Sequence, residues 1–199
     1  PSSLRRELAF LALSSASIFS AIIILSVALG CSLIPEGPGL QIYRVAESLL
    51  QHGSLVPDKF REIEAFLIET TKRDSSSMWQ DVYSLTTEGE PFPKHSILCS
   101  ILLVPFVALA SSLGVALWSI AVSTGLVCVI HLLARQLIPN LPWQLSFFSC
   151  IFGTQIPLTC VGVPYDSVGA LLVAGGLACL RFFPKTGGFL VGLAIFCRP

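Results

Sequence analysis

Residues 83–96 read YSLTTEGEPFPKHS, and they close a polar segment, residues 35–95, that lies between two apolar runs. The first apolar run covers residues 8–34 and the second covers residues 96–134. The polar segment holds ten of the chain's 12 acidic residues and six of its 12 Lys and Arg residues. We therefore expect a membrane protein with one long polar loop. Chemistry on a polar substrate is expected where that loop meets the membrane.

The composition of the whole chain is that of a protein built for lipid. Only 12% of residues are charged, 53% are hydrophobic and the mean hydropathy is +0.78, whereas soluble proteins average about a quarter charged residues. The formal net charge of zero argues against nucleic acid as a partner. The seven cysteines lie in or beside apolar runs without a C-x-x-C pair, so we interpret them as small buried hydrophobic residues.

The ends of the sequence suggest a piece of a longer protein. The chain starts at Pro1, its one methionine is Met78, and it stops at Pro199 within or just after an apolar run. We expect residues 1–199 to be a single membrane domain, the N-terminal part of a longer polytopic protein.

The first apolar run predicts a transmembrane helix over residues 8–34. It is longer than the roughly 20 residues that cross a bilayer, and longer than the apolar core of a signal peptide. Arg5 and Arg6 precede it, which predicts a cytoplasmic N-terminus. The polar segment is then an extracytoplasmic loop. Within it, we expect an amphipathic helix over residues 42–50, and a second helix after Pro57.

The second apolar run is too long for one untilted helix, and residues 111–114 (SSLG) divide it. In one arrangement both halves span the membrane as a hairpin. In the other, residues 96–110 dip into or lie on the outer leaflet, and residues 115–134 span.

The distribution of cations favours the second arrangement, because it places Arg135, Arg181 and Lys185 on the cytoplasmic side and Asp166 outside. Pro105 also weakens a full span by the first half.

Further spans are expected over residues 143–163, 167–183 and from 188 onward, which gives an all-α polytopic membrane helix bundle. Small residues repeat along the span 167–183, a pattern that favours close helix packing in lipid. They are Gly169, Ala170, Ala174, Gly176 and Ala178. Asp166 precedes this span, where it is either a functional carboxylate at the membrane surface or the cap of a helix that begins at Ser167.

Several short motifs resemble the multi-pass glycosyltransferases of the GT-C superfamily, in particular the protein-mannosyltransferase-like (GT39-type) membrane proteins. The resemblance covers most of the 199 residues. It rests on residues 90–95 (EPFPKH) before an apolar helix with Pro105-Phe106, on an aspartate that opens a later helix, on residues 46–50 (AESLL) with 52–54 (HGS), and on residues 192–194 (GLA) before Arg198-Pro199.

The resemblance implies transfer of a sugar from a polyprenyl-phosphate-type lipid to an acceptor on the outer face of the membrane. In the family, an acidic residue in the first external loop is the general base or positions a divalent cation such as Mg²⁺ or Mn²⁺, and a second acidic residue assists. The matching residues here are Glu36 and Asp166, which would also be the metal ligands. The family's loop usually carries an Asp a few residues before a Tyr, and this chain has only Glu36 before Tyr43.

Four further residues are candidates for substrate binding. Lys94 is either a phosphate-binding cation or a snorkelling interfacial lysine. His95 is either a proton carrier or a polar group at the interface. Arg44 is either a second phosphate-binding cation or a solvated cation on a helix surface. Tyr43 adjoins Arg44 in the matched loop.

The alternative function is that of a non-enzymatic multi-pass membrane protein, either part of a transporter or an assembly or lipid-binding subunit. The predicted spans after residue 114 carry His131 and the terminal Arg181 as ionisable residues, and no internal repeat is evident, which favours the enzyme. We expect the plasma (inner) membrane of a prokaryote as the location. The partners are then membrane lipid and a lipid-linked sugar donor.

Overall fold

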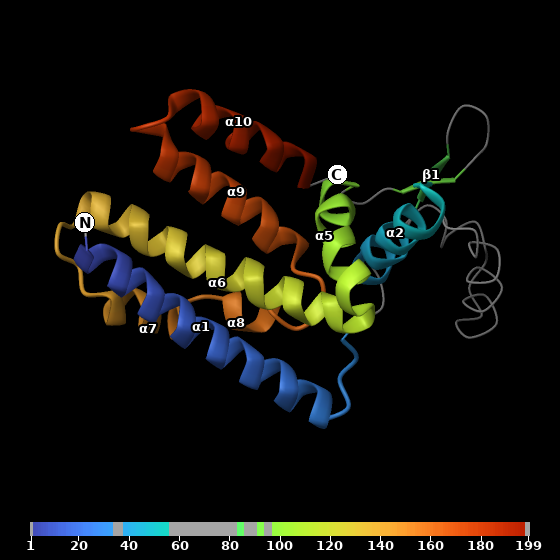
Figure 1. Cartoon of the computed structure of the whole chain (residues 1–199), viewed down its shortest axis with the longest axis horizontal. Helices are drawn as coiled ribbons and strands as arrows, with labels where there is room; N and C mark the ends of the chain where they lie inside the picture. Colours follow the sequence, from blue (N-terminus) through green and yellow to red (C-terminus); the bar gives the residue numbers. More distant parts are fainter. Residues whose placement is uncertain (1, 34–37, 56–82, 86–90, 94–96, 198–199) are drawn as a thin grey trace.

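The structure, a computed structural model, describes residues 2–33, 38–55, 83–85, 91–93 and 97–197 (Figure 1). The described chain is helical apart from one antiparallel pair of short strands, which the all-α prediction did not include. The elements are α1 (Ser2–Ala28), α2 (Pro38–His52), β1 (Tyr83–Leu85), β2 (Pro91–Pro93), α5 (Ile97–Ala110), α6 (Ser112–Leu137), α7 (Trp143–Gly153), α8 (Ile156–Thr159), α9 (Tyr165–Leu180), α10 (Pro184–Ala194) and a 3₁₀ turn (Ile195–Cys197).

Two helices are long and apolar enough to cross a membrane, Leu4–Ala28 within α1 and Ser112–Leu137, which is α6. The first had been expected over residues 8–34, but the helix starts earlier and ends at Ala28. Gly30 explains the end, because it adopts the left-handed conformation (φ 88°) that terminates helices, and its N–H bonds to the carbonyl of Val27. The apolar run therefore continues past the helix that it forms.

The second apolar run breaks at Ser111, within the four residues predicted to divide it. Ser111 has a φ of 49°, and α5 and α6 lie on either side of it. Figure 1 shows α5 running across the direction of α6, and the C-terminal end of α6 beside the start of α1. Arg135 near the end of α6 bonds to Glu7 in α1, so these two ends lie together. The hairpin arrangement would place them at opposite ends of the bundle, so this contact favours the second arrangement.

The single span expected over residues 143–163 is wrong, because two short helices, α7 and α8, occupy this stretch. The break lies at Thr154, which has extended backbone. Its hydroxyl donates to the carbonyl of Cys150 (2.6 Å) and accepts from the N–H of Ile156 (3.2 Å), replacing helical hydrogen bonds. Pro157, which has no N–H to donate, follows at the start of α8.

The later helices are near their expected positions. Most of residues 167–183, expected to span the membrane, lie in α9, which begins at Tyr165 and ends at Leu180 and is an apolar helix shorter than the two candidate spans. The helix expected from residue 188 is α10, which begins at Pro184. Pro184 suits a first helical position, because its missing N–H would have no partner there.

Two apolar clusters hold the helices together. The first joins α2, α5, the start of α6 and the start of α9. Its members are Ile42, Tyr43, Ala46, Cys99, Leu103, Val107, Val115, Trp118, Val122, Val163, Val168 and Cys197. The second joins α1, the later part of α6, α7 and α8. Its members are Leu11, Phe19, Ile23, Leu126, Val127, Phe147, Cys150, Ile156 and Cys160.

Within the small-residue stripe of α9, Gly176 makes the closest approach to another helix. A Cβ built on it would lie 2.8 Å from the carbonyl oxygen of Gly187 and 2.6 Å from Val191 Cγ2, both in α10. A Cβ on the neighbouring Gly175 would meet nothing within 4 Å. The contact between α9 and α10 therefore depends on one face of α9.

We expect Gly176→Ala to lower the free energy of unfolding by about 1–3 kcal/mol, because the new methyl group overlaps backbone of α10. Gly175→Ala is the matched control, and it should be neutral or stabilise the helix by up to about 1 kcal/mol. Unfolding of the purified chain in detergent measures both. Equal effects of the two substitutions would contradict the packing of α9 on α10 described above.

Candidate functional site

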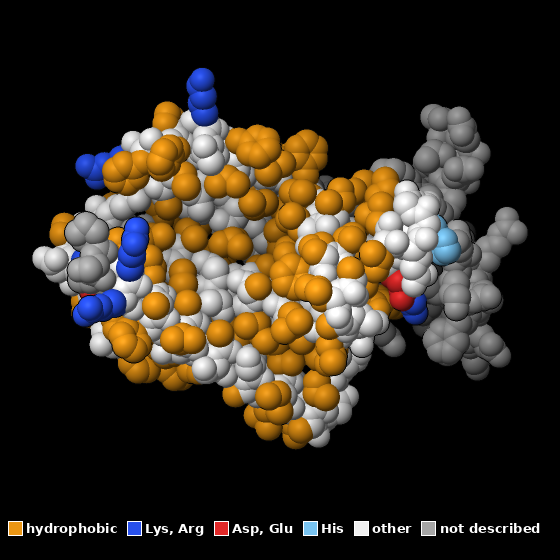
Figure 2. Space-filling model, in the orientation of Figure 1, with side chains coloured by type: hydrophobic (Ala, Val, Ile, Leu, Met, Phe, Trp, Pro, Cys, Tyr) orange, Lys and Arg blue, Asp and Glu red, His pale blue; other side chains and the backbone are white. Residues whose placement is uncertain are grey.

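The charged residues of the described chain divide between its two ends. Figure 2 shows Lys and Arg side chains gathered at the end that holds the N-terminus, apolar side chains over the middle, and a smaller charged group at the other end. The first group, which we call the cationic end, is Arg5, Arg6, Glu7, Arg135, Arg181 and Lys185, and the second is Arg44, Glu47 and Asp166.

The second group lies around the first apolar cluster, which α2, α5, the start of α6 and the start of α9 share. Tyr43 of α2 is buried in the first apolar cluster, which also holds Val163 and Val168 on either side of Asp166. The thiol of Cys99 in α5 lies 3.9 Å from the carbonyl oxygen of Tyr165. Asp166 itself is exposed in the first turn of α9. The structure thus places α2, α5 and the start of α9, which carries Asp166, around one apolar cluster.

Arg44 and its neighbours on α2 carry the polar groups of this end. The Nη1 atom of Arg44 donates to Glu47 Oε2 at 2.8 Å, one helical turn away. The Nε atom of Arg44 and the Oε1 atom of Gln41 are buried without a hydrogen-bond partner. Buried polar atoms are nearly always satisfied, so these two atoms are open to a further partner. The ring of Tyr43 is 5% exposed and packs in the core of this end.

Three predicted residues, Glu36, Lys94 and His95, lie outside the described residues, as does the second helix expected after Pro57. The structure therefore reports on Tyr43, Arg44 and Asp166 alone. Among the described residues, no group of three or more His, Cys, Asp and Glu side chains could hold a metal ion.

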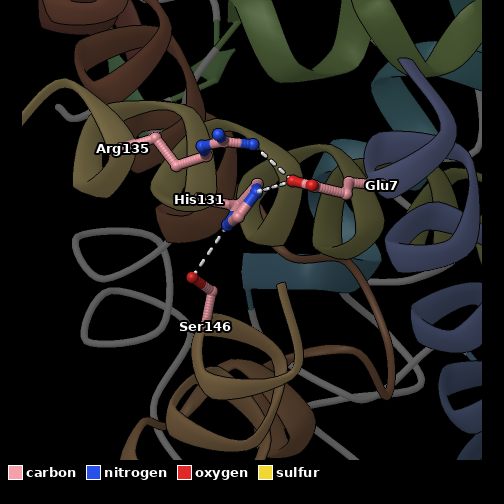
Figure 3. A network of polar contacts seen from close by, with 4 residues as sticks. All are labelled: Glu7, His131, Arg135 and Ser146. Carbon is pink, nitrogen blue, oxygen red and sulfur yellow. Dashed lines mark hydrogen bonds and ion pairs between the residues drawn. The ribbon is translucent and has the colours of Figure 1, made fainter. Parts of the chain in front are cut away.

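A polar network that the sequence reasoning missed joins three helices near the cationic end (Figure 3). Glu7 of α1 accepts a hydrogen bond from the guanidinium of Arg135 in α6. His131, one turn earlier in α6, is completely buried, and its Nε2 atom lies 3.8 Å from Glu7 Oε2. Its Nδ1 atom lies 2.9 Å from the hydroxyl of Ser146 in α7. We call these four residues the Glu7 network.

The Glu7 network contains a serine, a histidine and a carboxylate in the order that activates a serine nucleophile in enzymes. The geometry of the network differs from that of such a catalytic site. The His131 Nε2 atom has no hydrogen-bond partner, because 3.8 Å to the carboxylate exceeds hydrogen-bond distance. The carboxylate of Glu7 is instead bound by Arg135. The polar contacts of the network therefore link α1 and α7 to α6. They give no support for covalent chemistry at Ser146.

The sequence did contain a partial signal for this network. His131 and Arg135 are four residues apart, so a helix places them on one face, and both lie in a run that is otherwise apolar. The partner Glu7 lies 128 residues from Arg135. Only the antiparallel placement of α1 beside α6 brings them together.

Comparison with protein-family models, with curated protein sequences and with solved structures finds no match to this chain. The structure itself defines a helical protein with two helices long and apolar enough to span a membrane. A more particular function is therefore a proposal that rests on the residues just described.

Proposed function

We propose that the chain is part of a polytopic membrane glycosyltransferase of the GT-C type. It transfers a sugar from a polyprenyl-phosphate-type donor to an acceptor on the outer face of the membrane. The observation that carries this proposal is that Val163 and Val168, on either side of Asp166, share the first apolar cluster with Ile42 and Tyr43 of α2. In sequence, Glu36 precedes the first residue of α2, Pro38, by two positions. Both proposed carboxylates are therefore close in sequence to helices that share the first apolar cluster.

The orientation of the chain follows from its cations. Lys and Arg residues accumulate on the cytoplasmic side of membrane proteins, so the cationic end faces the cytoplasm and Asp166 faces outside. The plasma membrane of a prokaryote suits a donor on a polyprenyl phosphate. This orientation also puts residues 35–95 on the side where the reaction takes place.

Each proposed residue has a role in sugar transfer. Glu36 removes the proton of the acceptor hydroxyl as the anomeric carbon is attacked. Asp166, exposed at the start of α9, assists and would share a divalent cation with Glu36. Arg44, whose side chain is partly exposed, together with Lys94 and His95, binds the donor phosphate, because cationic donors form the strongest hydrogen bonds to phosphate. Tyr43 supports Arg44 from the core.

We expect Asp166→Asn and Glu36→Gln each to lower the rate of sugar transfer by about 100-fold or more, the usual contribution of a general acid or base. Membranes that contain the full protein are incubated with radiolabelled polyprenyl-phosphate mannose and, in parallel, glucose, and sugar incorporation is counted. Glu47→Gln is the matched control, since Glu47 is a carboxylate of the same end that is bound to Arg44. Full activity of both carboxylate variants, at equal protein level, would refute the mechanism.

The Glu7 network does not favour transport as the function. Ionisable residues that carry a substrate or proton across a membrane lie at mid-depth in the spanning helices. Glu7 is near the start of α1, and Arg135 is near the end of α6. Among the described residues, the charged groups of the two long helices therefore lie at one end of the bundle.

A further inference from the structure

We propose that the cationic end of the bundle binds the headgroups of anionic phospholipids. Four of its cations, Arg5, Arg6, Arg181 and Lys185, are exposed. They come from separate parts of the chain, since two stand in the first turns of α1 and two at the turn between α9 and α10. Figure 1 shows both places at the same end of the molecule, and Figure 2 shows the cations gathered there.

Among the described residues, the cationic end holds a single acidic side chain beside these four cations. Within the described ranges, the carboxylates are Glu7, Glu47 and Asp166, and only Glu7 belongs to the cationic end. Glu7 is already bound to Arg135. The Glu7 network thus pairs one cation internally. The described residues at this end offer the other four no carboxylate, so these four are open to external anions.

Exposed apolar side chains adjoin the cations and identify the source of those anions. Phe182 and Phe183, between Arg181 and Lys185 in sequence, are 67% and 65% exposed. The Arg181 guanidinium lies 5.8 Å from the centre of the Phe182 ring. Cations that border exposed aromatic and aliphatic surface match the boundary between lipid headgroups and acyl chains.

Aromatic side chains also mark this boundary on α1 and α7. Phe10 of α1 is 58% exposed, and it stacks on Trp143 at the start of α7 with ring centres 6.4 Å apart. Tryptophan favours the depth of the headgroups. A nucleic acid would leave these rings in water, so the surface fits a lipid bilayer and not a soluble polyanion.

The test compares lipid preference in the full chain purified in detergent. Native mass spectrometry measures the ratio of bound phosphatidylglycerol to bound phosphatidylcholine from an equimolar mixture. Each surface cation beside anionic lipid is worth about a fivefold preference. The Arg181→Gln/Lys185→Gln variant should therefore lower the ratio about tenfold or more. The matched control, Arg181→Lys/Lys185→Arg, keeps both charges and should keep the ratio.

Three results would overturn the proposal. The first is an unchanged ratio in the Arg181→Gln/Lys185→Gln variant. The second is an equal loss in the charge-conserving control, because headgroup binding at this surface depends on charge. The third is full displacement of phosphatidylglycerol by millimolar glycerol phosphate, which would indicate a site for a small anion. None of these results bears on sugar transfer, so the proposed function stands or falls separately.

Discussion

The Glu7→Gln and Arg135→Gln variants are each expected to have a free energy of unfolding about 2 kcal/mol lower than that of the native chain. Either change leaves one member of the Glu7–Arg135 pair without its counter-charge. Removal of one partner of a fully buried pair costs about 3–5 kcal/mol. The Glu7 and Arg135 side chains are 29% and 21% exposed, which reduces this cost.

Removal of both charges should lower the free energy of unfolding by less than the sum of the two single changes. In Glu7→Gln/Arg135→Gln no uncompensated charge remains, and two amides can hydrogen bond to one another. The coupling energy is expected to be about 1–2 kcal/mol. Chemical or thermal unfolding in detergent measures it, with a thiol-reactive dye that reports exposure of the buried Cys150 and Cys160. Strictly additive effects would contradict a direct interaction between Glu7 and Arg135.

The pair of Arg44 and Glu47 provides the control for this prediction. Its side chains are 37% and 27% exposed, much as those of Glu7 and Arg135. The Arg44–Glu47 pair differs because both residues belong to one turn of the same helix. It therefore links no helix to another. Glu47→Gln should therefore cost only about 0.3–0.5 kcal/mol. A cost equal to that of Glu7→Gln would mean that the Glu7 network does not hold α1 and α6 together.

The sequence predicted helices well where local chemistry determines them. Residues 42–50 alternate apolar and polar groups with the period of a helix, and they lie within α2. The break at Ser111 follows from two serines and a glycine in an apolar run. The break at Thr154 was missed, because threonine is compatible with a membrane helix and only its hydroxyl geometry reveals the interruption. Composition alone cannot distinguish these two cases.

The candidate sites could also be predicted only where the local sequence determines them. The side of the membrane on which Asp166 lies was predicted by counting helices and cations, and it stays a prediction. The Glu7 network depends on the packing of α1 against α6. The hydrophobic periodicity of the sequence does not predict which helices pack together. The pair of Arg44 and Glu47 has helical i, i+3 spacing, so the sequence could have shown that one donor of Arg44 is already in use.

The Gly114→Ala variant is expected to lose about 3 kcal/mol or more of its free energy of unfolding, at the upper end for overpacking. A Cβ on Gly114 would lie 2.0 Å from the carbonyl oxygen of Phe106 and 2.9 Å from the backbone nitrogen of Val107. These atoms belong to the backbone of α5, so no change of side-chain rotamer relieves the overlap. The two helices must move apart at their tightest point.

This movement would reach the end of the bundle where sugar transfer is proposed. Phe106 stacks edge-on against Trp118 of α6, with ring centres 5.1 Å apart, and Trp118 belongs to the first apolar cluster. The same cluster holds α2 and the start of α9 in place. We therefore expect Gly114→Ala to expose Cys99, which is completely buried in α5, and to raise its rate of reaction with a thiol reagent under native conditions.

Gly188→Ala is the matched control for Gly114→Ala, because a Cβ on Gly188, inside α10, meets nothing within 4 Å. It should be neutral or stabilise the chain by up to about 1 kcal/mol, with Cys99 unreactive as in the native protein. Equal stability of the two variants would show that α5 does not lie against Gly114. The proposed grouping of α2, α5 and the start of α9 would then lose its structural basis, since α5 is the element that α2 packs against in the first apolar cluster.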